Sequence, residues 1–408
     1  MFRTVTTSPT LQINTLSREL AAQGRDIIKF GFGQSPFLPP TGVIAALQGA
    51  ADRKEYSSVQ GSLELRQRIA KFHFDHNGLK VQPENILLAP GSKILLFSIM
   101  MAFEELDVLI PQPAWVSYAP QVKLLGQHPI LVKTSFTQRW RATAENLRAA
   151  VQQKRYQSSL LILNYPGNPD GLSYSAEELQ TITKVARELN IWVIADEIYG
   201  LLDFENQHQS LANFYPEGTI TTTGLSKWCG AGGWRFGAAF LPDAIPVDFK
   251  RALIGIASET YSCAPVPVQV AAEAAYADYA KLADYLQYQL EILKEVGTYC
   301  ATQLQSFGVK VHAPQGGFYI FPDFENHREK LAQAGIKTSG EFCKKLLSDT
   351  GVALLPGTAF GCSPEQLTAR LAFVDFNEPA DNEGFSWSKH GVRVKDGIER
   401  IGEWLAKW

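Results

Sequence analysis

The sequence predicts an α/β fold with a mainly parallel seven-stranded sheet. Short runs of β-branched or leucine-rich residues recur through the middle of the 408-residue chain, each bounded by turn residues. Most are separated by helical patterns, an alternation typical of parallel strands with helices on both faces of the sheet. The expected strands are residues 85–89, 107–110, 129–132, 160–163, 191–195, 219–223 and 237–241.

The helical segments between and beyond these strands complete the prediction. Residues 94–103 and 175–189 have helical patterns, and from about residue 271 a proline-free pattern continues to residue 304. A helix or helix pair of that length can bridge two domains, and the length of the chain favours two or three domains. A second, α+β layer should follow, with strands at 310–312, 317–322 and 370–374, helices at 339–347 and 395–408, and a polar surface loop at 377–393.

Composition and charge narrow the class of protein. The chain is 45% hydrophobic and 19% charged, with a net charge of −3 and scattered lysines and arginines, which argues against nucleic-acid binding. Residues 1–7 lack the apolar stretch of a signal peptide, and no run of about 18 apolar residues occurs, so we expect a cytoplasmic enzyme. Five widely spaced cysteines predict reduced thiols and no metal site.

Polar residues lie where three of the expected strands end. Asn164 and Asp196 end or directly follow apolar runs, and Lys227 follows the run at 219–223. Ligands of parallel sheets bind at the carboxyl ends of the strands. We therefore expect these three residues in one cleft.

The loop at 224–237 (GLSKWCGAGGWRFG) places Lys227 eight residues ahead of Arg235. It follows NYPGNP at 164–169 and ADEIY at 195–199. In this order the motifs resemble the class I/II aminotransferases, pyridoxal-phosphate (PLP) enzymes of fold type I similar to aspartate and tyrosine aminotransferases. The resemblance implies a large PLP-binding domain at 40–290 and a small α+β domain formed by 1–39 and 291–408.

The resemblance also assigns roles around the cofactor ring. Lys227 would hold the PLP aldehyde as a Schiff base and act as the base that moves a proton between the substrate Cα and the cofactor. Asp196, at the end of a buried strand, would keep the pyridine nitrogen protonated. Asn168 and Tyr199 would hydrogen bond the phenolate oxygen, and Trp115 would stack on the ring.

The phosphate site is expected in two parts. Gly91, Ser92 and Lys93 follow a strand and open a helix, where free amides and the helix dipole attract anions. Arg235 adds a bidentate cation. Many family members carry Ser or Thr three residues before the lysine, where this chain has Gly224, and Ser226 lies next to the lysine instead.

Three further residues complete the expected site. Arg370 matches the arginine that clamps the substrate α-carboxylate, and its planar fork suits that task. Gly33 matches the glycine whose backbone lies against the substrate, and Asn168 is expected to contact the substrate as well. Tyr56 resembles the tyrosine that reaches the phosphate of the neighbouring subunit, which implies a homodimer with shared active sites.

The resulting hypothesis is a ping-pong aminotransferase that passes an amino group from an L-amino acid to a 2-oxo acid such as 2-oxoglutarate. The stretch at 255–265 has no cation to pair with a distal carboxylate, and Phe37, Tyr56 and Tyr319 are plausible pocket neighbours. This favours aromatic or large neutral donors. Aspartate remains an alternative if Lys93, Lys123 or a residue of the partner subunit supplies the missing charge. A β-eliminating carbon-sulfur lyase would share the cofactor residues, whereas a PLP-sensing transcription regulator would need a longer N-terminal segment.

Overall fold

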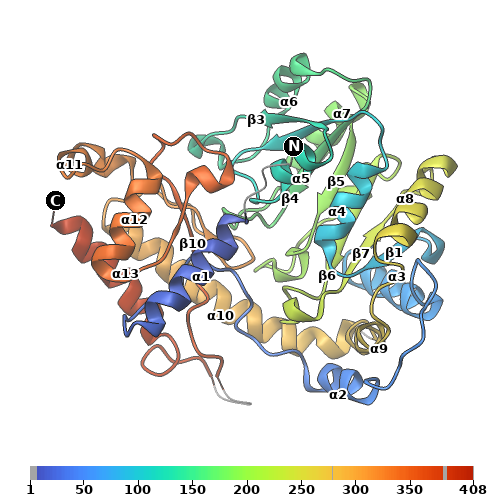
Figure 1. Ribbon diagram of the computed structural model, residues 1–408, viewed down its shortest axis with the longest axis horizontal. Coiled ribbons are helices and arrows are strands. Elements are labelled where there is room, and N and C mark those ends of the chain that lie inside the picture. The colour runs from blue at the N-terminus through green and yellow to red at the C-terminus, as the bar shows by residue number, and fades with distance from the viewer. Residues whose placement is uncertain (1–6, 278, 380–383, 408) are drawn as a thin grey trace.

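The computed structural model describes residues 7–277, 279–379 and 384–407, and its centre is a seven-stranded sheet in the order β1-β7-β6-β5-β4-β2-β3 (Figure 1). The strands from β2 to β6 pair in parallel, and β7 runs antiparallel to β1 and β6. The predicted mainly parallel sheet is therefore confirmed. Its strands are β1 (Ile86–Ala89), β2 (Asp107–Pro111), β3 (His128–Val132), β4 (Ser159–Asn164), β5 (Trp192–Asp196), β6 (Thr219–Gly224) and β7 (Gly237–Phe240).

Helices bury both faces of this sheet. Because successive side chains of a strand point to opposite faces, Leu160 and Ile162 join one apolar cluster while Leu161 and Leu163 join another. Strands buried on both faces read as continuous apolar runs, which is why the sequence revealed them. The face of Leu160 and Ile162 is covered by α4 (Ser92–Met101), α5 (Tyr118–Leu124) and α8 (Val247–Thr260). The opposite face is covered by α6 (Ala144–Ala150), α7 (Ala176–Glu188), α3 (Leu63–Asn77) and α9 (Val266–Ala275).

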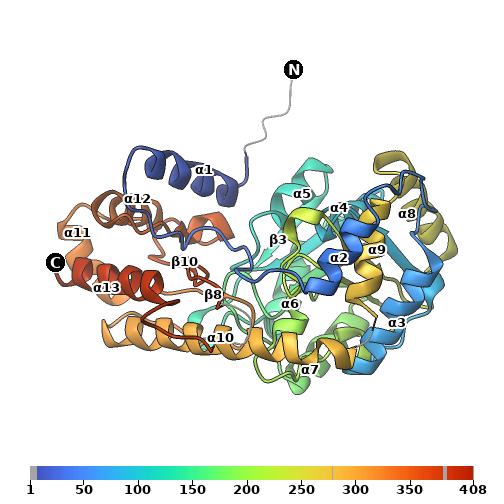
Figure 2. The ribbon, with the colours of Figure 1, turned by 90° about the horizontal axis from the view of Figure 1, so that it is seen from below.

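A second, smaller part is built on the three-stranded antiparallel sheet β8-β10-β9. The helix α10 (Tyr279–Ser306) runs alongside both parts in the two views of the ribbon (Figures 1 and 2). The expected domain limit at residue 290 lies within this helix, and the domain limits stay a prediction. The other elements are α1 (Pro9–Ala22), α2 (Thr41–Gly49), β8 (Tyr319–Ile320), α11 (Arg328–Gln333), α12 (Ser339–Thr350), β9 (Leu355–Pro356), β10 (Ala369–Ala372) and α13 (Val392–Ala406).

One expectation for the second part was wrong, and another was only partly right. Residues 310–312 form no strand ladder; Lys310 makes one isolated bridge to Asp323, and the apolar neighbours that suggested a strand are buried in the core instead. The segment 377–393 is not simply a polar surface loop, because Phe385 and Trp387 pack against the core. Residues 380–383 of that segment lie outside the described residues, as do residue 408 of the last expected helix and residues 1–6.

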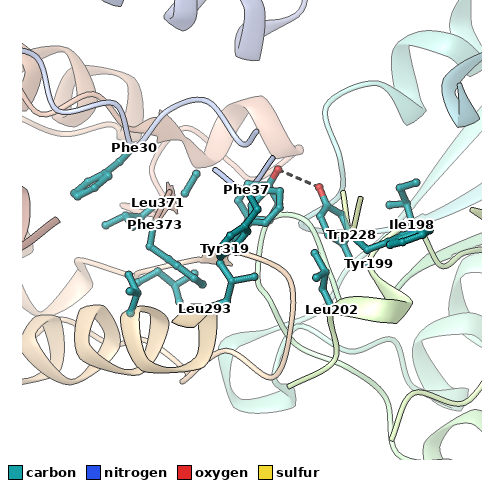
Figure 3. Close-up of a cluster of buried hydrophobic side chains, with 14 of the residues drawn as sticks. Phe30, Phe37, Ile198, Tyr199, Leu202, Trp228, Leu293, Tyr319, Leu371 and Phe373 are labelled. Atoms are coloured by element: carbon teal, nitrogen blue, oxygen red, sulfur yellow. Dashed lines mark hydrogen bonds between the residues drawn. The ribbon is translucent and has the colours of Figure 1, made fainter. Parts of the chain in front are cut away.

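One apolar cluster continues from the small part into the large part. Figure 3 shows Phe30, Leu371 and Phe373 on one side and Trp228 and Leu202 on the other, all members of this cluster. A shared core fixes how the two parts face each other, and with them the cleft between the two sheets.

The remaining expectations concern thiols and membranes. The five cysteines are free thiols, and Cys229, Cys300 and Cys343 are buried, so most of them fill the core as expected. Among the described residues, no group of three or more His, Cys, Asp or Glu side chains is arranged to hold a metal ion. In the same part of the chain, no helix has the length and apolar character needed to cross a membrane.

Candidate active site

A cavity of about 560 Å³ opens at the carboxyl ends of β4, β5 and β6, against the small part of the molecule. Most of the residues that the sequence singled out line this one cavity, although they lie far apart along the chain. They are Gly33, Ser92, Lys93, Trp115, Asn168, Asp196, Tyr199, Ser226, Lys227, Arg235 and Arg370.

Strand register places the polar residues side by side at the floor of the cavity. Asn164 and Asp196 are the last residues of β4 and β5 and pair with each other, and Asp196 pairs with Thr222 of β6. The side-chain amide nitrogen of Asn164 donates to the backbone carbonyl of Asp196 at 2.8 Å. The side-chain oxygen of Asn164 accepts from the backbone N–H of Asn168 at 2.8 Å. Asn164 thus ties the loop that carries Asn168 to the neighbouring strand.

The Asp196 carboxylate is buried, and two hydroxyls hold it. The Tyr118 hydroxyl donates to one carboxylate oxygen at 2.6 Å and the Thr222 hydroxyl donates to the other at 3.2 Å. Burial raises the pKa of Asp196 to about 6, and these hydrogen bonds oppose the rise. The carboxylate therefore needs donors or a cation to stay charged at lower pH.

Lys227 follows β6 and reaches across to the N-terminal segment. Its ammonium donates to the Gly33 carbonyl at 3.2 Å and lies 5.4 Å from the ring centroid of Tyr199. The Tyr199 hydroxyl donates to the Tyr319 hydroxyl at 3.0 Å, which joins the large and small parts at the cavity (Figure 3). A Cβ at Gly33 would lie 1.9 Å from the Tyr319 hydroxyl, so only glycine allows this approach.

One corner of the cavity is arranged for an anion. The N-terminus of α4 is preceded by Gly91 and has no side-chain cap, so first-turn amides are free to face a ligand. Arg235 adopts a left-handed backbone conformation (φ 60°) and turns its guanidinium to this helix. A Cβ at Gly91 would lie 2.1 Å from that guanidinium. Lys93 lines the same cavity, and burial together with the charges of Arg235 and Lys227 lowers its pKa.

The position three residues before the lysine has a structural explanation. A Cβ at Gly224 would lie 2.4 Å from the Phe236 carbonyl oxygen of the paired strand region. A serine or threonine hydroxyl is therefore excluded there by the close approach of β6 to β7. Ser226 lines the cavity instead.

Arg370 is buried at the opposite end of the cavity. Its guanidinium donates to the Asn168 side-chain oxygen at 3.0 Å and to the Gly31 carbonyl at 2.7 Å, and it lies 4.6 Å from the Tyr319 ring centroid. Its Nε is buried without a hydrogen-bond partner, and the described residues provide no carboxylate to pair with it. A buried cation with an unused donor is suited to bind an anionic ligand.

Some expected neighbours lie elsewhere. Tyr56 is 86% exposed and does not line the cavity of this chain. Phe37 is not a pocket residue, because its ring is buried in the core against Tyr288 and Phe376. Lys123 is exposed on α5, outside the cavity.

Sequence reasoning missed Tyr118 and Thr222, the two residues whose hydroxyls hold Asp196. Tyr118 comes three residues after Trp115, which the sequence singled out, so its position was a usable signal. Thr222 lies in the middle of a run of threonines, and only the pairing of β5 with β6 shows which of them faces Asp196.

The donor set fits pyridoxal phosphate. The uncapped helix and Arg235 suit a phosphate, and the missing side chain at Gly91 lets the Arg235 guanidinium approach the N-terminus of that helix. Asp196 suits a protonated ring nitrogen, and Lys227 is an amine close to both. The cavity thus offers an anion site, a carboxylate and an amine within one enclosure.

Comparisons with known proteins agree with this architecture, which is that of fold type I PLP-dependent transferases. The family model "Aminotransferase class I and II" matches residues 25–375. An aspartate aminotransferase of Bacillus sp. (strain YM-2) is 33% identical over 381 residues, covering 91% of this chain and 93% of that protein. The chain therefore belongs to the class I and II aminotransferases and is a PLP-dependent transaminase.

Solved structures show the same similarity. The structure of aspartate aminotransferase from Thermus thermophilus with maleate matches with a TM-score of 0.84 at 25% identity, covering 98% of this chain and 100% of that chain. The aromatic aminotransferase from Pyrococcus horikoshii OT3 matches with a TM-score of 0.81 at 26% identity, covering 96% and 99%. The relatives thus include proteins named for two different substrate classes.

Proposed function

We propose that this chain binds pyridoxal phosphate in the cavity and transfers the amino group of a dicarboxylic L-amino acid, aspartate in the first place, to a 2-oxo acid such as 2-oxoglutarate. The observation that carries the donor class is the Lys93 ammonium. It lines the cavity, and within the described residues it has no carboxylate partner. The expected preference for aromatic donors is not confirmed by the comparisons.

The cofactor residues have separate tasks. Arg235, Ser92 and the first-turn amides of α4 bind the phosphate, and Trp115 covers the ring. Asp196 pairs with the ring nitrogen as an anion. When bound, pyridoxal phosphate supplies an electron-withdrawing ring that stabilises negative charge at the substrate Cα.

Lys227, Tyr199, Asn168 and Arg370 act on the reacting groups. Lys227 would hold the cofactor through its amine and, when that amine is free, would carry a proton between the substrate Cα and the cofactor. Tyr199 and Asn168 hydrogen bond the phenolate oxygen. Arg370 clamps the α-carboxylate, which every donor and acceptor shares, and the backbone of Gly33 lies against the substrate.

Lys93 distinguishes the donors because of its surroundings. Its ammonium lies 5.0 Å from the Trp115 ring centroid, and burial lowers its pKa, so a carboxylate beside it would offset a desolvation cost. The stretch at 255–265, which argued against a dicarboxylate, contributes no side chain to the cavity of this chain. The names of the Bacillus and Thermus relatives support the same donor class.

Aromatic donors are the second candidate. Phe32, Trp115, Tyr118, Tyr199 and Tyr319 line the cavity, and their rings offer apolar surface to a large neutral side chain. The Pyrococcus relative carries the name of an aromatic aminotransferase. Of the three neighbours that the sequence suggested for such a pocket, only Tyr319 lines it.

Donor kinetics test this proposal. We expect kcat/KM with 2-oxoglutarate to be higher for aspartate than for tyrosine, phenylalanine or methionine, and Lys93→Met to lower it for aspartate by about tenfold or more, since one tenfold step is about 1.4 kcal/mol. The change should be selective for aspartate. Lys123→Met, which removes an exposed lysine outside the cavity, is the matched control. It should leave kcat/KM unchanged both for aspartate and for the neutral donors.

Three results would redirect the proposal. An equal loss for all donors, together with weaker cofactor binding, would make Lys93 a phosphate residue. A preference for phenylalanine or tyrosine in the wild type would establish the aromatic candidate. Ammonia release without any added 2-oxo acid would indicate the carbon-sulfur lyase reaction.

We also propose a homodimer of cytoplasmic location, in which Tyr56 of one subunit completes the phosphate site of the other. The support is the family resemblance of Tyr56, together with its 86% exposure on the loop between α2 and α3, outside the cavity of its own chain, which leaves the ring accessible to a second subunit.

A further inference from the structure

Asp196 receives its strongest hydrogen bond from a residue that the cofactor motifs do not include. Tyr118, the first residue of α5, donates to the carboxylate at 2.6 Å, and both side chains are buried, with exposures of 2% and 3%. The Tyr118 ring also packs edge-on against Trp115, with ring centroids 5.2 Å apart. Its hydroxyl is therefore held in place from two directions.

The direction of this hydrogen bond is fixed. Burial, the adjacent Asp196 carboxylate and the nearby Tyr199 all raise the pKa of Tyr118 well above its ordinary value, so the phenol keeps its proton. Tyr118 can then only donate to Asp196. A donor of this kind stabilises the charged form of the carboxyl group and opposes the effect of burial.

The groups that face Asp196 leave few other sources of charge stabilisation. Thr222 on β6 donates at 3.2 Å, a longer contact, and the Ile198 amide contributes from the same segment. The adjacent Glu197 is a like charge, and its carboxylate is occupied by Tyr165 and Ser210.

The nearby cations do not reach the carboxylate. Lys93, Lys227 and Arg235 line the cavity with Tyr199, but no ion pair to Asp196 is formed by the residues that the structure describes. Tyr118 is therefore the principal short-range donor to this carboxylate.

We propose that Tyr118 is a positioning residue that keeps Asp196 ionised and aimed into the cavity, and thereby decides whether the proton shared with the cofactor ring nitrogen resides on the ring. The inference rests on the proposed function, in which Asp196 pairs with that nitrogen. Without the phenol, the carboxyl group would more readily take the proton itself, and the charged pair would become a neutral one.

Nitrogen NMR of the holoenzyme tests this directly. Wild type, Tyr118→Phe and Tyr319→Phe are loaded with pyridoxal phosphate labelled with ¹⁵N in the ring, and the ¹⁵N shift is followed between about pH 5 and 9. This range includes the pKa of about 6 that burial gives Asp196 and the second ionisation of the phosphate, also at about pH 6. Tyr118→Phe keeps the ring that packs on Trp115 and removes only the hydroxyl. Tyr319→Phe removes another buried hydroxyl of the cavity that does not touch Asp196.

We expect the ring nitrogen to be protonated in the wild type and in Tyr319→Phe, and to move towards the unprotonated shift in Tyr118→Phe at the same pH. The dissociation constant of the cofactor, measured by equilibrium dialysis of the holoenzyme, should be about tenfold larger in Tyr118→Phe than in the wild type. This is the usual effect of losing a hydrogen bond to a charged group. Thr222→Val should act in the same direction but less.

The possible failures are distinguishable. A ring nitrogen protonated equally in Tyr118→Phe and wild type would overturn the role of Tyr118 while leaving the proposed function intact. An unprotonated nitrogen in the wild type would overturn the pairing of Asp196 with the ring, and the inference with it. Equal shifts in Tyr118→Phe and Tyr319→Phe would show a general effect of lost hydroxyls and would also contradict the inference.

Discussion

Burial of the Arg370 guanidinium without an anion has a large desolvation cost. Its exposure is 1%, and its contacts are a side-chain amide oxygen, a carbonyl and two aromatic rings. Neutral acceptors compensate only part of the lost hydration of a cation. A substrate carboxylate would supply the missing charge, which gives this position a physical reason to bind every amino-acid and oxo-acid substrate alike.

Arg370→Lys should therefore raise KM for both the donor and the acceptor. A point charge replaces the planar fork that now bonds Asn168 and Gly31 and directs its remaining donor at the substrate. Steady-state kinetics with each substrate varied in turn measure this effect. If KM rose for only one substrate, Arg370 would instead be a residue that reads one side chain.

Asp196→Asn should yield a folded holoenzyme whose proton transfer is slower by several orders of magnitude. The amide is isosteric and can still accept from Tyr118, but it cannot stabilise a positive charge on the ring nitrogen. Single-turnover kinetics of the first half-reaction isolate this step. A variant within about tenfold of the wild-type rate, or about 1.4 kcal/mol, would contradict the assigned role.

Helix α3 carries two buried histidines on the side of the sheet that it shares with α9. His73 and His76 are spaced so that both contribute to a small buried pocket with Glu197 and His208. Burial lowers the pKa of His73 to about 3 and that of His76 to about 4. Within the described residues neither ring forms an ion pair with an acidic side chain, because Glu197 pairs with His208, and the neighbouring histidines lower both pKa values further.

These histidines should make the fold sensitive to acid. Their pKa values in the folded state lie below the ordinary value of 6.5, so the unfolded chain binds more protons between about pH 6.5 and 4. The contribution of these histidines to the free energy of unfolding is therefore fully present above that range. It falls as the pH drops through the range, by at most about 1.4 kcal/mol per pH unit for each group. Urea unfolding at several pH values measures the slope.

His76→Gln should flatten this slope, because it removes one of the two groups. Asn77→Ala, one residue further along the same helix, is the control, since it alters packing without removing a titratable group. An unchanged slope in His76→Gln would show that the acid sensitivity arises elsewhere.

At the scale of the whole molecule, the cavity lies where the two parts meet. Gly33, Arg370 and Tyr319 come from the small part, whereas Asp196 and Lys227 come from the large sheet. The shared apolar cluster and the hydrogen bond between Tyr199 and Tyr319 hold these two sets of residues together (Figure 3). The exposed Tyr56 adds a third contributor if a second subunit covers it.

Subunit complementation tests that last contribution. Lys227→Ala should have no transaminase activity, and Tyr56→Ala should bind the cofactor weakly. In a mixed dimer, one site combines the intact Lys227 of one subunit with the intact Tyr56 of the other. Mixing the two variants, with exchange of subunits under mild denaturant, should therefore restore activity at limiting cofactor. No recovery, or sedimentation as a monomer, would contradict a shared site.

Local patterns in the sequence determined the strands of the large sheet and the motif residues at their ends. Apolar runs of strand length are legible because parallel strands are buried on both faces, and a residue that ends such a strand must lie at the carboxyl edge of the sheet. This is why Asn164, Asp196 and Lys227 could be placed in one cleft without coordinates.

Only the tertiary structure decided which distant side chains meet. Arg370 bonds Asn168 across 202 residues, and Tyr118 bonds Asp196 across 78 residues. Phe37 was expected in the pocket but lies in the core, and Phe385 and Trp387 turned an expected polar loop into packed structure. The physical reason is that periodicity reports which face of an element is buried, whereas the partner that buries it is chosen by the packing of the whole chain.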